Sequence, residues 1–478
     1  MTRYTSATDA DREAMLAEIG AASVDQLFEE LPAEVRLDRP LELPDGLGES
    51  EVYDHLAALA ARNADAESEV CFIGAGFYDH YVPALVDAII SRSEYLTPYT
   101  PYQPEISQGG LQAMFEFQTA ISELTGLPVA NASLYEGPSS VASAGYLAIG
   151  ATKGRKRFVV SRGVHPHSRE TLRSYAKGFG AEVVEVDLEN GVTNPDAIAD
   201  AVDDDTAAVF VQNPNFLGAI EDFEALAAPA KEAGALAVAA VDPIALSVLK
   251  PPGECGFDVA VGEGQALGNR LDFGGPSFGF FAAAEAHVRR MPGRIAGETE
   301  DVDGRRGFVL ALQTREQHIR REKATHNICT SQALNALAGV IYLSWLGKQG
   351  FRELGELLVQ RTAYARERLA AVDGVELLHE APVVREFAVR VDAPVEAVLD
   401  ACAAEGIGAG YALGRDYPEF SDGLLVALTE RRSKEEIDRL AEVLGRAVAG
   451  ARGQRGGFDV DMTRNPPQAT ETVPEATR

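Results

Sequence analysis

The fold of this chain is decided by the apolar segments RFVVS (157–161), EVVEV (182–186), AAVFV (207–211) and ALAVAAV (235–241). Each has the length and the aliphatic composition of a buried β-strand. Helical patterns fill the three intervals between them, at 168–179, 194–202 and 222–233. Asn194 followed by Pro195 gives the second helix an N-cap and a first-turn proline. Short apolar strands that alternate with helices predict a parallel sheet with helices on both faces.

The regions on either side of this core have different patterns. Residues 1–68 combine helical segments with the proline-bearing stretch LPAEVRLDRPLELPDGLGES, and we interpret them as an N-terminal arm. A large α/β domain is expected over 69–310, and a helical connection with a smaller α/β domain over 311–452. The strands expected in the smaller domain are 375–378, 386–391 and 424–428, and its helices 395–405 and 434–449. The polar, Pro- and Thr-rich residues 453–478 predict a disordered tail.

The composition excludes some classes of protein. The net charge of the 478 residues is −30, and a surface this acidic repels nucleic acid, because phosphate binding needs clustered Lys and Arg. Salt screens such self-repulsion, so we expect a halophilic source. The chain has no long apolar run and no secretory signal at its polar N-terminus, so no membrane partner and a cytoplasmic location are expected. Its cysteines, of which there are 4, form no CxxC pair, so no zinc site is predicted.

Long ordered segments outside the strand pattern identify a family. They are YLTPYTPYQPEISQGGLQAMFEFQTAISELTGLPVAN (95–131), NASLYEGPSSVASA (131–144), VQNPNFLGAIED (211–222), VAVGEGQALGNRLDFGGPSFGFFA (259–282) and the stretch from RRMPGRIAG to NALAG (289–339). Together with the sequence around them they resemble the P-protein family of the glycine cleavage system, glycine dehydrogenase (decarboxylating). The resemblance implies the pyridoxal phosphate (PLP)-dependent transferase fold of the aspartate aminotransferase type.

A PLP enzyme of that type needs several groups at one site. An aspartate contacts the pyridine nitrogen, an aromatic or histidine ring covers the ring face, and amides at a helix N-terminus hold the phosphate. The chain offers Asp242 after the strand ALAVAAV, His165 and His167 after RFVVS, and the segment 136–140 (EGPSS) before a helix. Gly74-Ala75-Gly76 lacks the third glycine of a dinucleotide loop, so we interpret it as a structural turn.

The lysine that would bind PLP covalently is missing from its expected place. The resemblance implies a loop in the window 259–281, which contains Arg270 and no lysine. Arginine forms no Schiff base, because its guanidinium stays protonated. Lys250, in LSVLKPPGE, is interpreted as a surface residue.

This lysine-free version resembles subunit 1, the alpha subunit, of the two-subunit P-protein. The resemblance implies a homologous second subunit that carries PLP, an α2β2 assembly, glycine as substrate and lipoamide of the H-protein as acceptor of the aminomethyl group. It assigns no catalytic residue and no metal ligand to this chain.

Two groups of residues are candidates for a contribution to the partner's site. Thr325, with Asn327 beside it, could contact the cofactor phosphate across the interface, or these residues could cap the following helix. Tyr95, Tyr99 and Tyr102 lie among prolines in a stiffened loop and could line a substrate entrance or simply pack at an interface.

Three hypotheses follow from the sequence. The chain is a non-catalytic subunit of a heteromeric glycine decarboxylase, a self-sufficient PLP enzyme that uses Lys250 or another lysine, or a regulatory or scaffold protein that has kept only the fold. Fold-level kinship alone does not separate them. The long segment matches and the missing lysine favour the first.

Overall fold

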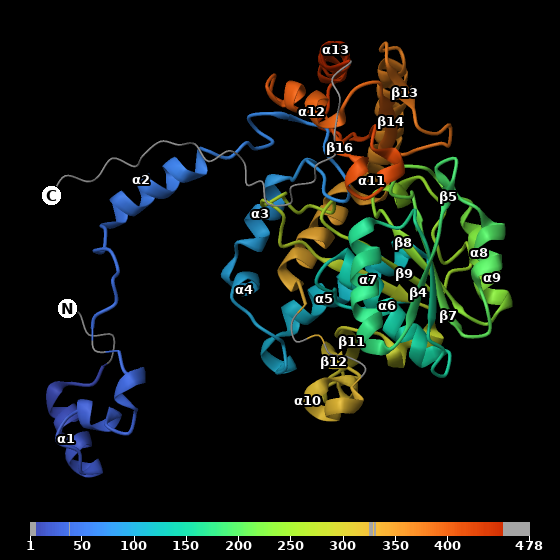
Figure 1. Ribbon diagram of the computed structural model, residues 1–478. Helices are drawn as coiled ribbons and strands as arrows, with labels where there is room; N and C mark the ends of the chain where they lie inside the picture. The colour runs from blue at the N-terminus through green and yellow to red at the C-terminus, as the bar shows by residue number, and fades with distance from the viewer. Residues whose placement is uncertain (1–5, 38, 325–327, 329–330, 453–478) are drawn as a thin grey trace. The chain divides into compact units, whose positions relative to one another are not determined.

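The computed structural model describes residues 6–37, 39–324, 328 and 331–452 (Figure 1). The chain separates into two compact units, Met1–Ala64 and Asp65–Arg478. In the first unit, helix α1 (Asp9–Ile19) begins at Thr8, whose hydroxyl accepts the N–H of Asp11 at 3.1 Å. Helix α2 (Glu49–Ala60) is the other α-helix in the described part of this unit. Neither helix has a buried residue, so the described part of this unit has no core of its own.

The second unit is built on a 7-stranded sheet with the order β2-β10-β9-β8-β7-β3-β4. Strands β9, β8, β7, β3 and β4 run parallel, and β10 is antiparallel to both of its neighbours. The strands in this order are Val129–Ala130, Gly279–Ala283, Val259–Glu263, Leu236–Val241, Thr206–Asn213, Arg157–Ser161 and Glu182–Val186. The predicted parallel sheet is therefore confirmed, with an antiparallel strand added near one edge.

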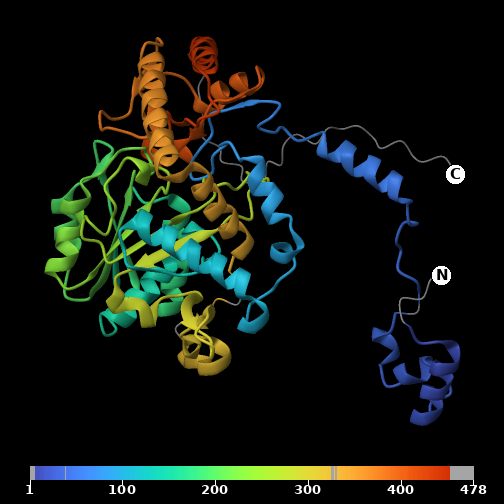
Figure 2. The ribbon, with the colours of Figure 1, turned by 180° about the vertical axis from the view of Figure 1, so that it is seen from behind.

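Helices cover both faces of this sheet. Alternate strand residues go to opposite sides, so that Phe158 packs with α6 (Gly137–Ala151) and α7 (Pro166–Phe179), whereas Val159 packs on the other face. That second face is covered by α5 (Gln108–Thr125), α8 (Pro195–Ala201), α9 (Phe223–Glu232) and α11 (Ala333–Ala370). Figure 1 shows α6 and α7 in front of the strands, and the reverse view in Figure 2 shows α5 in front.

Helix α11 connects the large domain to a smaller one. Its 38 residues are two helices that meet at Gly347, where φ is 62° and the helix is broken. The smaller domain contains a 4-stranded antiparallel sheet, order β13-β14-β17-β16, packed against two helices of its own and the C-terminal end of α11. Its elements are β13 (Val375–Leu377), β14 (Glu386–Val391), β16 (Tyr411–Ala412), β17 (Gly423–Ala427), α12 (Val395–Ala403) and α13 (Lys434–Ala451). Strand β1 (Val70–Cys71) pairs with β15 (Ile407–Gly408) and brings the start of the second unit to this domain.

The sequence pattern missed some elements. The window 259–281, expected to hold a loop, contains β9 and β10 with the loop between them. An antiparallel hairpin, β11 (Ile295–Glu300) and β12 (Arg306–Ala311), follows, and its first strand ends in polar residues. Smaller elements, also not predicted, are α3 (Ala84–Ile90), α4 (Ser93–Leu96), β5 (Leu188–Glu189) and β6 (Val192–Thr193), whereas the short α10 (Gln317–Arg320) lies in the expected helical connection. None of the described helices is long and apolar enough to cross a membrane.

Candidate functional site

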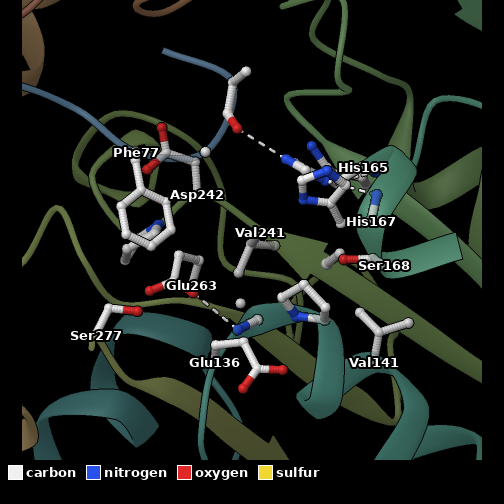
Figure 3. A pocket seen from close by; sticks show the side chains of 18 of the residues that line it. Phe77, Glu136, Val141, His165, His167, Ser168, Val241, Asp242, Glu263 and Ser277 are labelled. Carbon is white, nitrogen blue, oxygen red and sulfur yellow. Dashed lines mark hydrogen bonds between the residues drawn. The ribbon is translucent and has the colours of Figure 1, made fainter. Parts of the chain in front are cut away.

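A cavity of about 560 Å³ lies where β7, β8 and β9 end and where α6 and α7 begin (Figure 3). The carboxyl ends of parallel strands are the usual ligand-binding edge of an open α/β sheet. The lining of the cavity comes from segments far apart in sequence: 75–78, 135–138, 165, 167–168, 240–243, 262–263, 274 and 276–277, with Val141, Gln212, Gln332 and Arg385. The fold therefore brings together the glycine turn at 74–76, the EGPSS segment, the two histidines and Asp242.

The N–H groups of the first turn of α6 are all used by the chain itself. Gly137 donates to the carboxylate of Glu263 at 2.9 Å, and Ser139 donates to the carboxylate of Glu136 at 3.0 Å. Ser140 donates to the main-chain carbonyl of Glu136 at 3.1 Å. The residue after Gly137 is a proline and has no N–H. The helix end that would hold an anion has no free donor left in this turn.

Glu263 is held at this helix end by several groups. It is the last residue of β9, and its second carboxylate oxygen accepts the N–H of Gln265 at 2.9 Å. Burial raises the pKa of the Glu263 carboxyl group, whereas a hydrogen bond with the Ser277 hydroxyl acts to lower it. A Cβ on Gly137 would meet the backbone nitrogen of Glu263 at 3.1 Å, so glycine allows the close approach. Both oxygens accept N–H groups, which fits the ionised carboxylate.

Asp242, which matches the aspartate that faces the pyridine nitrogen in PLP enzymes of this type, is bound to Arg385. The guanidinium donates to both carboxylate oxygens, at 2.6 Å each, and the two side chains are 4% and 14% exposed. The same guanidinium lies 3.4 Å from the centre of the Tyr78 ring. The Tyr78 hydroxyl donates to Glu386 at 2.7 Å. Burial opposes the charge of Arg385, but Asp242, Tyr78 and Glu386 outweigh it and raise its pKa.

His165 is neutral and fixed in one tautomer. Its Nε2 lies 2.9 Å from the carbonyl oxygen of Ala75, and its Nδ1 accepts the N–H of His167 at 3.1 Å. Burial lowers the pKa of His165 to about 4. The Nε2–H therefore donates to Ala75, and the ring connects the turn at 74–76 to the start of α7.

The residues proposed to reach a partner's site are only partly described. Thr325 and Asn327 lie outside the described residues, although Gln332, a little further along the chain, lines the cavity. Tyr95 and Tyr99 line a separate pocket of about 250 Å³ beside α5 and α11, which shares no lining residue with the cavity. Tyr102 lines neither of them, and its hydroxyl accepts from Arg294 at 3.2 Å.

No lysine is found among the described residues that line the cavity. Lys250 is half exposed and pairs with Glu224, 2.5 Å away, on the surface. The position of Lys250 therefore gives no support to a Schiff base at this site.

Sequence reasoning missed two of the side chains that define the site. Glu263 lies in a quoted segment, but nothing near it in sequence shows that it meets Gly137, 126 positions away. Arg385 is 143 positions from Asp242 and comes from the start of the smaller domain. One signal was available: an acidic residue that ends a parallel strand, on the edge where helices begin.

The fold defines the class of protein. It is the PLP-dependent transferase fold of the aspartate aminotransferase type. Two solved structures under 25% identical show the same fold: a sphingosine-1-phosphate lyase of Burkholderia pseudomallei (TM-score 0.63, 16% identity, 88% of this chain and 95% of that chain) and a "NIFS-LIKE PROTEIN" (TM-score 0.58, 14% identity, 80% and 100%).

The chain belongs to the glycine cleavage system P-protein family, whose profile matches residues 2–444. A protein of Carboxydothermus hydrogenoformans named "Probable glycine dehydrogenase (decarboxylating) subunit 1" is 50% identical over 93% of this chain and 99% of its own length. One of Desulforamulus reducens with the same name is 48% identical over the same shares. A crystal structure of "glycine decarboxylase (P-protein) of the glycine cleavage system, in inhibitor-bound form" matches with a TM-score of 0.85 and 45% identity, over 93% of this chain and 100% of that one.

The cavity does not fit PLP, the cofactor that the fold implies. The amides that would hold a phosphate are bound to Glu263 and Glu136. The carboxylate that would face the pyridine nitrogen is bound on both oxygens by Arg385. Among the described lining residues, no amine is present to form a Schiff base.

Proposed function

We propose that this chain is the subunit of a two-subunit glycine decarboxylase that does not bind PLP. Together with a homologous PLP-bearing subunit, expected in an α2β2 heterotetramer, it decarboxylates glycine and transfers the aminomethyl group to lipoamide of the H-protein. The full-length match to proteins named subunit 1 supports the pairing. The observation that carries the proposal is the self-occupied cavity, in which each group that would bind PLP is bound by the chain itself.

The partner would supply the covalent chemistry, and this chain would complete the shape of the shared site. Thr325 and Asn327 are proposed to reach the partner's cofactor phosphate, since hydroxyl and amide groups are suitable donors to phosphate. Tyr95, Tyr99 and Tyr102 are proposed to line the entrance for the lipoyl arm. Substitution of Thr325 by Ala should then weaken PLP retention by the assembled complex, measured by dialysis, while the circular dichroism of this chain stays unchanged. Unchanged retention would contradict the phosphate contact.

The N-terminal unit is proposed to pack on the partner. Its described residues include large apolar side chains that are exposed, such as Val35 at 70% and Leu43 at 73%. An exposed apolar set of this size is typical of a surface that another chain covers. A chain that begins at Asp65 should fold but lose its partner during size-exclusion chromatography, and retained assembly would contradict this role. A cytoplasmic location and a halophilic source remain predictions.

The deciding experiment is borohydride reduction of the chain alone and of the co-expressed complex, followed by peptide mass spectrometry. We expect a pyridoxyl-lysine adduct on the partner only, and glycine decarboxylation only in the mixture. An adduct on Lys250, or on any other lysine of this chain, would instead make it a PLP enzyme in its own right. A folded complex without decarboxylase activity would favour a scaffold role.

A further inference from the structure

Two carboxylates from different parts of the chain lie at the N-terminus of α6. Glu136 is the N-cap residue, and its side chain accepts the N–H of Ser139. Glu263 arrives from the end of β9 and satisfies Gly137. Together with the main-chain bond of Ser140 they use every N–H group of the first turn. The side chain of Glu136 satisfies Ser139 alone, and the carboxylate that satisfies Gly137 comes from a strand end 126 positions away.

The position of Glu263 is also what an anion-binding site would need. Its carboxylate lies against a helix N-terminus, where the positive end of the helix dipole favours negative charge. It also accepts from the Gln265 N–H and bonds to the Ser277 hydroxyl, on the far side of the loop between β9 and β10. A phosphate at this place would take the same donors, and it would meet the charges of both glutamates.

We propose that Glu263, with Glu136, is a built-in anion that excludes phosphate-bearing ligands from the cavity and so leaves PLP to the partner subunit. This inference rests on the proposed function and names the residues that enforce it. Occupation of the phosphate donors by Glu263 prevents PLP binding more completely than the absence of a lysine does. PLP that forms no Schiff base can still be held through its phosphate. A carboxylate already seated on the phosphate donors removes that second route as well.

The test measures binding to the full-length chain by titration calorimetry. The probes are inorganic phosphate, PLP, and pyridoxal, which lacks the phosphate. In Glu263→Ala the Gly137 and Gln265 amides become free and one negative charge is lost. We expect the dissociation constants of phosphate and PLP to fall by roughly tenfold or more relative to the wild type. The dissociation constant of pyridoxal should not change.

A second substitution and a control keep the test decisive. Glu263→Gln keeps the side-chain volume, removes the charge and replaces one of the two acceptor oxygens with an NH₂ donor. It serves if the alanine variant does not fold, and it should bind phosphate more tightly than the wild type. Glu221→Gln is the matched control, because Glu221 is a buried glutamate that accepts the Thr193 N–H at 3.1 Å outside the cavity. It should leave phosphate binding unchanged.

Three results would overturn the inference. One is that folded Glu263 variants and the wild type bind phosphate with the same affinity. Another is that the variants gain equally for pyridoxal and PLP, which would indicate volume rather than charge. The last is that Glu221→Gln raises phosphate affinity as much as the Glu263 variants do. These outcomes are separate from a failure of the proposed function. A lysine adduct on the wild-type chain would refute the accessory role, whatever the variants bind.

Discussion

Substitution of Arg385 by Met should strongly destabilise the chain, because it leaves Asp242 charged and almost buried without its partner. The guanidinium donates to both oxygens at 2.6 Å, and the arginine side chain is only 4% exposed. Removal of one partner from a buried ion pair costs about 3–5 kcal/mol of folding free energy. The contact of the guanidinium with the Tyr78 ring at 3.4 Å adds to this loss, by about 0.5–2 kcal/mol.

Asp242→Asn should cost less than Arg385→Met. The asparagine oxygen can still accept the N–H of Ile244, which Asp242 binds at 3.0 Å. Arg385 also keeps the attraction of Glu386, the second carboxylate that raises its pKa. We expect Asp242→Asn to lose about 2–3 kcal/mol of folding free energy. The double variant should lose at least ~2 kcal/mol less than the sum of the two single losses.

Urea unfolding of the four proteins in this cycle gives the coupling energy directly. The chain has 1 tryptophan, Trp345 on α11, so its fluorescence reports on the helix that connects the two domains, and far-UV circular dichroism provides an independent probe. Arg352→Met is a suitable control, because its pair with Glu356 is on the surface, with the arginine 76% exposed. A cycle in which the two losses add within about 0.5 kcal/mol would refute the idea that the pair acts as a unit.

Three further predictions concern pH, salt and the surface lysine. His80 and His165 both have a pKa lowered to about 4 by burial, so between about pH 6.5 and 4 the unfolded chain holds protons that the folded chain does not. Stability should therefore fall on acidification through this window, by about 2 kcal/mol per histidine at pH 5. The stability advantage of the wild type over His80→Gln should shrink over the same range. An advantage that stays constant with pH would contradict this prediction. The net charge of −30 predicts that the urea midpoint rises between about 0.1 and 1 M KCl, as the screening length falls from about 10 to 3 Å; a midpoint that falls would contradict the role of self-repulsion. Lys250→Met should change stability by less than about 1 kcal/mol and leave glycine decarboxylation by the complex unchanged, so a lost activity would restore the self-sufficient enzyme as a candidate.

The sequence predicted the parts of this fold whose signals are local. Strand β3 was predicted at its observed bounds, and α8 has the predicted Asn194 cap, whose side chain accepts the N–H of Asp196 at 2.9 Å. The hairpin β11–β12 was missed, because its first strand, IAGETE, ends in polar residues that give no apolar period. Such a strand exists only because its neighbour pairs with it along six residues, from Ile295 opposite Ala311 to Glu300 opposite Arg306.

The candidate site divides in the same way. Asp242, His165 and the EGPSS segment were predicted because each follows a strand or precedes a helix, and such positions converge at one edge of the sheet. What those groups bind was not predictable, since Arg385 and Glu263 come from elsewhere in the chain and a pairing over such separations has no local pattern. The roles of Thr325 and Asn327 stay predictions.

The two unpredicted side chains have a common physical explanation. A fold that evolved around an anionic, aromatic cofactor has a buried aspartate and a set of helix amides, and both are costly when left without partners. In this chain Arg385 satisfies the aspartate and Glu263 satisfies the first amide, so neither group is left without a partner. The same two contacts that stabilise the cofactor-free fold also remove the contacts that PLP would need. Stability without the cofactor and exclusion of the cofactor are therefore one structural property, and a variant that opens the phosphate end should lose some stability as it gains affinity for phosphate.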